Sequence, residues 1–182
     1  MLILQPMEGQ WRVTEQQLIN LYLQGQTSAF DILYKRHKDS LYRFILGMIG
    51  NTHCAEDIAA KVWCKFIDKC EQINSNPVAY LYAIARNQVA EYYRSQKAAN
   101  NIEDETILVA GLLEEKAESE GVVSKLSVLP LEQREALLLK HFAGYTLDEI
   151  ACYQNINRES AKTRLRYAMS KIRHILSPVG TL

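Results

Sequence analysis

Apolar residues recur with the period of an α-helix along most of this chain, and no stretch alternates between apolar and polar residues as a half-buried strand does. Residues that begin or end helices repeatedly bound the helical pattern. Thr14 with Gln17 and Thr146 with Glu149 have the spacing of capping boxes, and Gly50 follows the end of a long apolar stripe. The pattern predicts an all-α fold.

The predicted helices fall into two groups separated by an acidic segment. Residues 1–98 carry 11 Lys and Arg against 9 Asp and Glu, whereas residues 99–121 carry 1 against 7. Residues 126–176 are again basic, with 8 against 5. We therefore predict two small helical domains joined by an acidic flexible linker. The predicted segments are an N-terminal extension (1–13), a first domain (14–97), the linker (98–124) and a second domain (125–177).

The second domain has the pattern of a helix-turn-helix. Asn155 lies where the chain must reverse, and Asn tolerates the left-handed backbone that such a turn needs. Asn157 then caps a second helix. Residues 158–173 of this helix carry 6 Lys and Arg against 1 acidic residue. A basic helix after a capped helix and a short turn is typical of a DNA reader that enters the major groove. The alternative is a solvated face on an ordinary amphipathic helix.

The helix that Asn76 and Pro77 begin interleaves tyrosines with cations. Such a helix can stack unpaired bases and hold a nucleic-acid backbone. The alternative is that several tyrosines belong to the core, and for Tyr82 we favour this interpretation.

Other classes of protein find little support. The four cysteines form no CxxC pair, and Cys54, Cys64 and Cys70 have the spacing of residues that pack on amphipathic helices, so we expect no metal site and no cofactor. No apolar run reaches the ~18 residues that span a bilayer. No nucleophile, base and orienting group have a catalytic spacing. We expect a cytoplasmic protein that is not an enzyme.

In several of these segments the chain resembles a bacterial RNA polymerase sigma factor of the extracytoplasmic-function type. The segment AEDIAAKVWCKFI from Ala55 is similar to the family's core-polymerase-binding helix, and PVAYLYAIARNQVAEYYRSQK is similar to its promoter-melting and −10 reading helix. In the second domain, the resemblance rests on Leu129-Pro130 with Arg134, Glu149-Ile150-Ala151 and Lys162-Thr163-Arg164-Leu165.

The resemblance implies roles for three groups of residues. The −35 element would be read by Arg158, Glu159, Ser160, Lys162, Thr163, Arg164 and Arg166. The −10 strand would be bound by Asn74, Ser75, Asn76, Tyr80, Arg86, Asn87, Tyr92, Tyr93, Arg94 and Lys97. The clamp of core polymerase would be contacted by Glu56, Asp57, Ala60, Lys61 and Lys65. The implied partners are core RNA polymerase, promoter DNA as duplex and single strand, and an anti-sigma factor.

The chain also departs from the family pattern. Ala60 and Lys61 stand where Gln and an acidic residue are common, and Tyr80 stands where Trp is frequent. Gln154-Asn155 replaces Leu-Gly in the turn. Two alternatives stay open: a helix-turn-helix regulator that is not a sigma subunit, and a helical adaptor that uses the apolar face of residues 58–67.

Overall fold

The computed structural model describes residues 13–73, 76–100 and 125–176, with the backbone alone for 97–100. Within these ranges the chain contains no β-strand, which confirms the predicted all-α fold. Most of the predicted extension and linker lies outside the described residues. The elements are α1 (Glu15–Leu23), α2 (Thr27–Ile49), α3 (Thr52–Asp68), the 3₁₀ turn η1 (Cys70–Gln72), α4 (Pro77–Asn100), α7 (Leu131–Leu138), the π-helical turn η2 (Leu139–Ala143), α8 (Leu147–Gln154) and α9 (Arg158–Leu176).

Local sequence signals set the helix ends as predicted. The Thr14 hydroxyl accepts from the Gln17 amide at 3.3 Å, and the Gln17 side chain accepts from the Thr14 amide at 2.9 Å. Thr146 and Glu149 repeat this capping box at 3.2 and 2.8 Å. Asn155 ends α8 in the left-handed conformation, with φ of 53°. Both capping boxes and the Asn turn are therefore confirmed.

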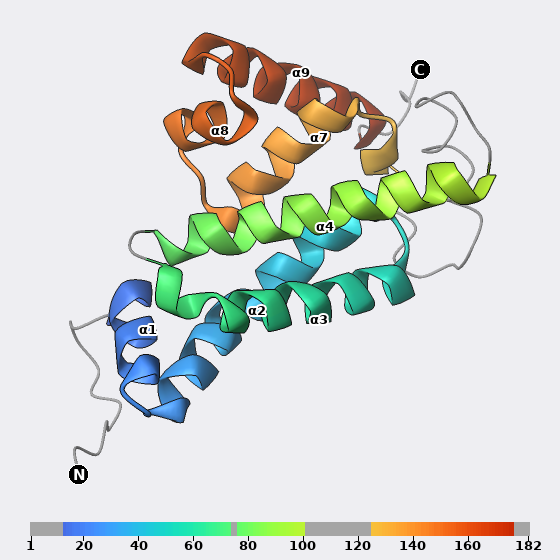
Figure 1. Ribbon diagram of the computed structural model, residues 1–182. Coiled ribbons are helices and arrows are strands. Elements are labelled where there is room, and N and C mark those ends of the chain that lie inside the picture. Colours follow the sequence, from blue (N-terminus) through green and yellow to red (C-terminus); the bar gives the residue numbers. More distant parts are fainter. Residues whose placement is uncertain (1–12, 74–75, 101–124, 177–182) are drawn as a thin grey trace.

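Helices α1 to α4 pack as one unit. In Figure 1, α4 lies across the middle of the molecule, with α2 and α3 on one side and α7, α8 and α9 on the other. Phe44 and Tyr82 are fully buried where α2 meets α4, and their rings pack edge to face at 5.1 Å. Val62 and Phe66 of α3 are buried against them in the same core. Tyr82 is thus a core residue, as predicted.

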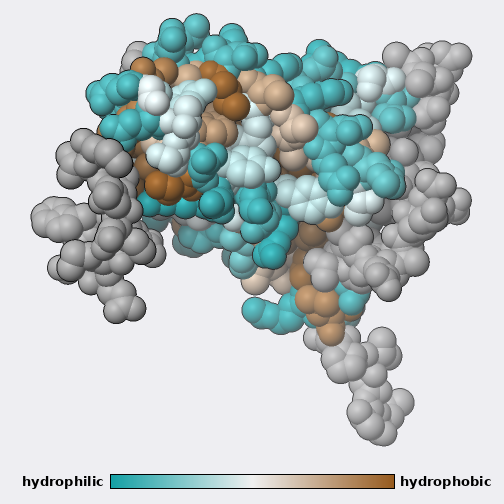
Figure 2. Space-filling model, turned by 90° about the horizontal axis from the view of Figure 1, so that it is seen from below, coloured by the Kyte–Doolittle hydropathy of each residue, from teal (hydrophilic) through white to brown (hydrophobic). Residues whose placement is uncertain are grey.

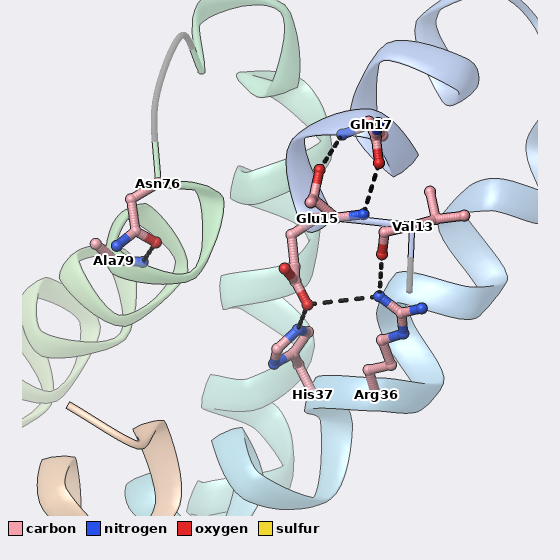
Figure 3. A network of polar contacts seen from close by, with 8 residues as sticks. Val13, Glu15, Gln17, Arg36, His37, Asn76 and Ala79 are labelled. Carbon is pink, nitrogen blue, oxygen red and sulfur yellow. Dashed lines mark hydrogen bonds and ion pairs between the residues drawn. The ribbon is translucent and has the colours of Figure 1, made fainter. Parts of the chain in front are cut away.

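Helix α1 is attached to α2 through a polar cluster beside its first turn (Figure 3). Arg36 donates from Nη1 to the Val13 carbonyl at 2.7 Å and pairs with the Glu15 carboxylate at 3.5 Å. His37 Nε2 lies 3.4 Å from the same carboxylate. Burial lowers the pKa of His37, and the Glu15 charge opposes this shift in part.

Helices α7, α8 and α9 enclose the second part of the core. Leu138, Ile150 and Ala161 are 2%, 0% and 0% exposed at the centre of this group. The helical pattern of the sequence continues to Phe142, but the last turn widens into the π-helical turn η2 before Gly144 ends it with φ of 69°. The widened turn lies against α2. It therefore adds contacts between the two halves of the molecule, which are α1 to α4 and α7 to α9.

The two groups of helices are in direct contact. Helix α2 packs against both α7 and η2. At the closest point, a Cβ built on Gly47 would lie 2.8 Å from the Leu138 side chain, so only glycine permits this approach. The buried residues of both groups therefore form one continuous cluster. Sequence periodicity predicted the helices but not this contact, because the partners are far apart in the chain.

Candidate nucleic-acid interface

The basic face predicted on the second helix of the helix-turn-helix is exposed on α9. Asn157 caps the helix by accepting from the Ser160 amide at 2.7 Å. Arg158, Lys162 and Arg166 follow at intervals of four residues, and all three are exposed. The first three turns of α9 therefore present three cations on one face.

Two of these cations have weak partners within the protein. Arg158 Nε lies 3.1 Å from Asp148, and Lys162 Nζ lies 3.6 Å from Glu159. The four side chains are all more than half exposed, at 57%, 74%, 62% and 73% respectively. Exposed ion pairs of this kind contribute about 0 to 1 kcal/mol to stability, so a DNA phosphate could replace the carboxylate of either pair at little cost in free energy.

An open hollow lies beside this face at the start of α9. It holds two half-buried hydroxyl residues, Ser160 and Thr163, which can donate to a phosphate or a base edge. Its lining residues are Ile156, Asn157, Glu159, Ser160, Thr163 and Arg164.

Arg164 differs from the other predicted −35 residues because its guanidinium turns inward. Its Nη1 donates to Gln154 Oε1 at 2.9 Å. The Gln154 amide in turn donates to Glu135 Oε2 at 2.8 Å and to the Glu132 carbonyl at 2.9 Å. Arg164 therefore stabilises the turn of the helix-turn-helix in this arrangement. Its predicted DNA contact would need another rotamer.

The loop before α4 contributes one described candidate, Asn76, since Asn74 and Ser75 lie outside the described residues. Asn76 accepts from the Ala79 amide at 3.0 Å and so caps α4 (Figure 3). This bond confirms the predicted helix start at Asn76 and Pro77. The cap occupies the only oxygen of this side chain, so a contact of Asn76 with DNA would use its NH₂ group.

The candidate tyrosines of α4 are half-buried rather than displayed. Tyr80 packs its ring 6.3 Å from Phe66. Tyr93 donates its hydroxyl to the Met48 carbonyl at 2.6 Å. Burial beside Cys54 raises the pKa of Tyr92 to about 12. These half-buried rings keep part of their surface open to solvent, where a base could stack, while the Tyr93 hydroxyl holds α4 to α2.

The polar candidates of α4 are more exposed. Asn87 and Arg94 face solvent, and Arg94 Nε is 3.3 Å from the Ala90 carbonyl of its own helix. Arg86 is also exposed, but its guanidinium contacts α8 and α7. The side chain of Lys97 lies outside the described residues.

The predicted core-binding residues share the outer surface of α3. All five are exposed there: Glu56, Asp57, Ala60, Lys61 and Lys65. The opposite face, which includes Ile58, Val62 and Phe66, is buried in the protein's own core. An adaptor that binds partners through this apolar face is therefore ruled out in this arrangement. Figure 2, which views the molecule from the side of α1, α2 and α3, shows a largely hydrophilic surface with small hydrophobic patches.

The polar residues between the two halves were not predicted from the sequence. Glu135 and Gln154 are buried at 6% and 8% exposure, and Arg134 is buried at 3%. Burial raises the pKa of Glu135, while the Gln154 hydrogen bond and the Arg86 charge lower it. Arg134 stood in the family pattern, whereas the only signal for Glu135 was a charged residue next to an apolar run.

Among the described residues, no three His, Cys, Asp or Glu side chains lie together as metal ligands. Cys54 is half-buried, Cys70 is buried, and Cys64 and Cys152 are exposed as free thiols. None of the helices in the described ranges has the length and hydrophobicity of a membrane span.

Comparison with protein families gives two matches in chain order. The model of sigma-70 region 2 matches residues 33–99, and the model of sigma-70 region 4 matches residues 120–172. Among curated relatives, the ECF RNA polymerase sigma factor SigW of Bacillus subtilis is 29% identical over 168 residues, which cover 82% of this chain and 89% of the relative. SigM of the same organism is 26% identical over 154 residues, which cover 80% and 93%.

Two solved structures share the fold. The sigma factor RpoE, solved in complex with the anti-sigma factor NepR from Bartonella quintana, has a TM-score of 0.66 at 20% identity and covers 81% of this chain and 96% of its own. CnrH, solved in complex with the cytosolic domain of CnrY, has a TM-score of 0.65 at 20% identity and covers 89% and 96%.

Proposed function

Because this chain belongs to the sigma-70 family, as an extracytoplasmic-function sigma factor of bacterial RNA polymerase, we propose that it reads a −35 element as duplex and a −10 element as single strand. Sigma factors act in transcription initiation and are not enzymes. The observation that carries the proposal is the exposed row of Arg158, Lys162 and Arg166 on α9, directly after a capped helix and a tight Asn turn.

The −35 element would lie against α9. The three cations neutralise phosphates, while Ser160 and Thr163 in the neighbouring hollow can reach base edges. Removal of one cation that binds a phosphate would reduce the salt slope of binding by about 0.9. The three cations together would therefore account for a slope of up to about 2.7.

The −10 strand would lie along α4. Opening about four base-pair steps costs on the order of 6 kcal/mol, at roughly 1.4 kcal/mol per step. Stacking on an aromatic ring returns about 1 to 3 kcal/mol per base, so two or three stacks on Tyr80, Tyr92 and Tyr93 would nearly offset the opening. Little free energy would remain for affinity. We infer that the free chain binds promoters weakly and that core polymerase supplies the remaining contacts.

Core polymerase would bind the outer surface of α3. Its five predicted contact residues lie on the surface and include both charge signs, which suits a polar contact with the clamp. An anti-sigma factor is a further proposed partner, since two structural relatives were solved with such proteins or with a companion domain.

The test is a selection from random duplex DNA, performed with the chain alone and with the chain bound to sigma-free core polymerase. We expect two separated elements to be enriched with core polymerase, and no element to be enriched by the chain alone. Tight, specific selection by the chain alone would favour the alternative of an independent helix-turn-helix regulator.

Matched variants assign the upstream element to α9. Replacing Arg158, Lys162 and Arg166 by Ala should remove enrichment of the upstream element and lower the salt slope. A control that replaces the exposed Lys35, Lys38 and Lys69 removes the same charge away from α9 and should leave the selected sequence unchanged. Equal effects of both triple variants would exclude α9 as the reader.

A further inference from the structure

Gln154, at the end of α8, joins all three helices of the C-terminal half through its side-chain amide. Its Nε2 donates to the Glu132 carbonyl at 2.9 Å and to Glu135 Oε2 at 2.8 Å, both on α7. Its Oε1 accepts from Arg164 Nη1 on α9 at 2.9 Å. Both polar atoms of the amide are therefore bound, as a residue with 8% exposure requires.

The chemistry of its neighbours allows the Gln154 amide only one orientation. The Arg164 guanidinium has donors and no acceptor, so it binds the oxygen of the amide. The NH₂ group must then point to Glu135, whose ionised carboxylate has acceptors only. A flipped amide would place donor against donor and acceptor against acceptor. Leucine, which is usual at this place in the family's turn, could make none of these bonds.

Arg164 lies on a different side of α9 from the three cations that would bind DNA phosphates. At 3.6 residues per turn, it lies about 200° around the helix from Lys162, the middle residue of that row. Arg164 is half-buried, whereas Arg158, Lys162 and Arg166 are exposed. While it binds Gln154, Arg164 therefore does not share the face on which a phosphate would lie.

Two observations favour the bond to Gln154 over a phosphate contact. If Arg164 turned outward, Gln154 Oε1 would lose this donor inside the protein, and a buried acceptor without a partner is costly. Burial raises the pKa of Glu135, and the Arg164 charge is among the influences that lower it. An outward Arg164 would thus also leave a buried carboxylate less compensated. We expect the bond to persist when α9 binds DNA.

The bond also supports the two hydroxyl residues that would reach base edges. Ser160 and Thr163 line the same hollow as Arg164, at the start of α9. A base contact needs its hydrogen-bonding groups within about 0.5 Å of the productive position, and supporting bonds of this kind supply that precision. Since Gln154 is itself anchored to α7, its bond to Arg164 is suited to fix the angle between α8 and α9.

We propose that Gln154 is a positioning residue for recognition of the −35 element. It keeps Arg164 inside the protein, and the pair fixes the angle at which α9 enters the major groove. Arg164 then contributes to the choice of bases without contacting DNA. This role rests on the proposed function, because that function places α9 on the −35 element.

Three variants test the pair in the complete chain bound to core polymerase. Gln154→Leu removes the acceptor for Arg164, Arg164→Ala removes the donor, and the double variant removes both partners. Arg158→Ala is the reference for a lost phosphate contact. Gln133→Leu is the matched control, because it makes the same change at a half-buried position of α7. Circular dichroism checks that each variant keeps its helices.

The first measurement is the ratio of affinities for promoter duplexes with the selected upstream element and with a scrambled one. A smaller fraction of folded protein weakens both affinities equally, so the ratio reports base recognition. We expect it to fall about tenfold in Gln154→Leu and in Arg164→Ala, which is in the range for one mismatched base pair. The double variant should lose no more than either single variant, since the two residues act as a unit. The control should keep the wild-type ratio.

The second measurement is the salt slope of the same binding. Arg158→Ala should lower the slope by about 0.9. Arg164→Ala should leave it unchanged, because Arg164 binds Gln154 and not a phosphate. An equal loss of slope in both arginine variants would overturn the proposed role of Gln154, and so would a wild-type ratio in Gln154→Leu. If the wild-type chain itself shows no preference for the selected element, the proposed function fails, and the role of Gln154 with it.

Discussion

Adding one methyl group at Gly47 should destabilise the packing of the two halves of the molecule against each other, which we call the closed arrangement. It should not destabilise the individual helices. In Gly47→Ala, the new Cβ would lie 2.8 and 3.0 Å from the two methyl carbons of Leu138 and 3.5 Å from Leu126 Cδ1. Leu138 is only 2% exposed and has little room to turn away. We expect the closed arrangement to be destabilised by about 1 to 3 kcal/mol through overpacking.

The same substitution should strengthen α2 itself. Alanine is favoured over glycine by about 1 kcal/mol in a helix interior, and this gain is present whether the halves are together or apart. The clash exists only in the closed arrangement, so the ratio of open to closed molecules should rise about 5-fold to 150-fold. The net change in the free energy of unfolding should be smaller, about 0 to 2 kcal/mol.

Spin-label distances between Cys64 and Cys152 measure the opening, and urea denaturation measures the stability. The matched test is a double-mutant cycle with Leu138→Ala, which removes the side chain that the new methyl would strike. The two changes should be coupled by about 0.5 to 3 kcal/mol, since the clash disappears in the double variant. Additive effects on both readouts would refute the proposed close approach of α2 and α7.

Three further predictions concern stability. Arg134→Met should lower the free energy of unfolding by about 2 to 4 kcal/mol in urea denaturation. The reason is that the guanidinium donates to the carbonyls of Met48, Ser127 and Leu129 at 2.9, 3.0 and 3.2 Å. A loss below about 1 kcal/mol would contradict this role of Arg134. Thr146→Ala should cost about 1 kcal/mol by breaking the capping box of α8, whereas Thr146→Ser should cost little. Burial lowers the pKa of His37 in the folded state, so the unfolded state binds the proton more readily. The stability of wild type relative to His37→Gln should therefore be constant above about pH 6.5, fall as the pH decreases from there toward the lower pKa of the folded state, and be constant again below it. A difference that is flat from about pH 8 to about pH 5 would exclude this linkage.

Helix boundaries were predictable because their causes are local. A capping box depends on residues three positions apart, and the turn at Asn155 depends on the backbone preference of one residue. The exposed row on α9 was predictable for the same reason, since residues four apart share a helix face.

The contact between the halves was not predictable, because its partners lie tens of residues apart. Nothing in the local sequence connects Arg86 to Glu135 or Gly47 to Leu138. Arg164 was assigned to DNA because of the resemblance to the family, yet its guanidinium binds Gln154. A glycine inside the last turn of a long apolar helix, before the glycine that ends it, was the available sign of a close approach, but it did not identify the partner.

The most direct test of the proposed promoter recognition is transcription by sigma-free core polymerase with this chain added, on templates that carry the selected elements. We predict transcripts that start at one fixed distance downstream of the −10 element, and that disappear when Arg158, Lys162 and Arg166 are replaced by Ala. Promoter recognition by this chain would be contradicted if the chain is folded and bound to the polymerase, yet the transcripts are the same as those of core polymerase alone.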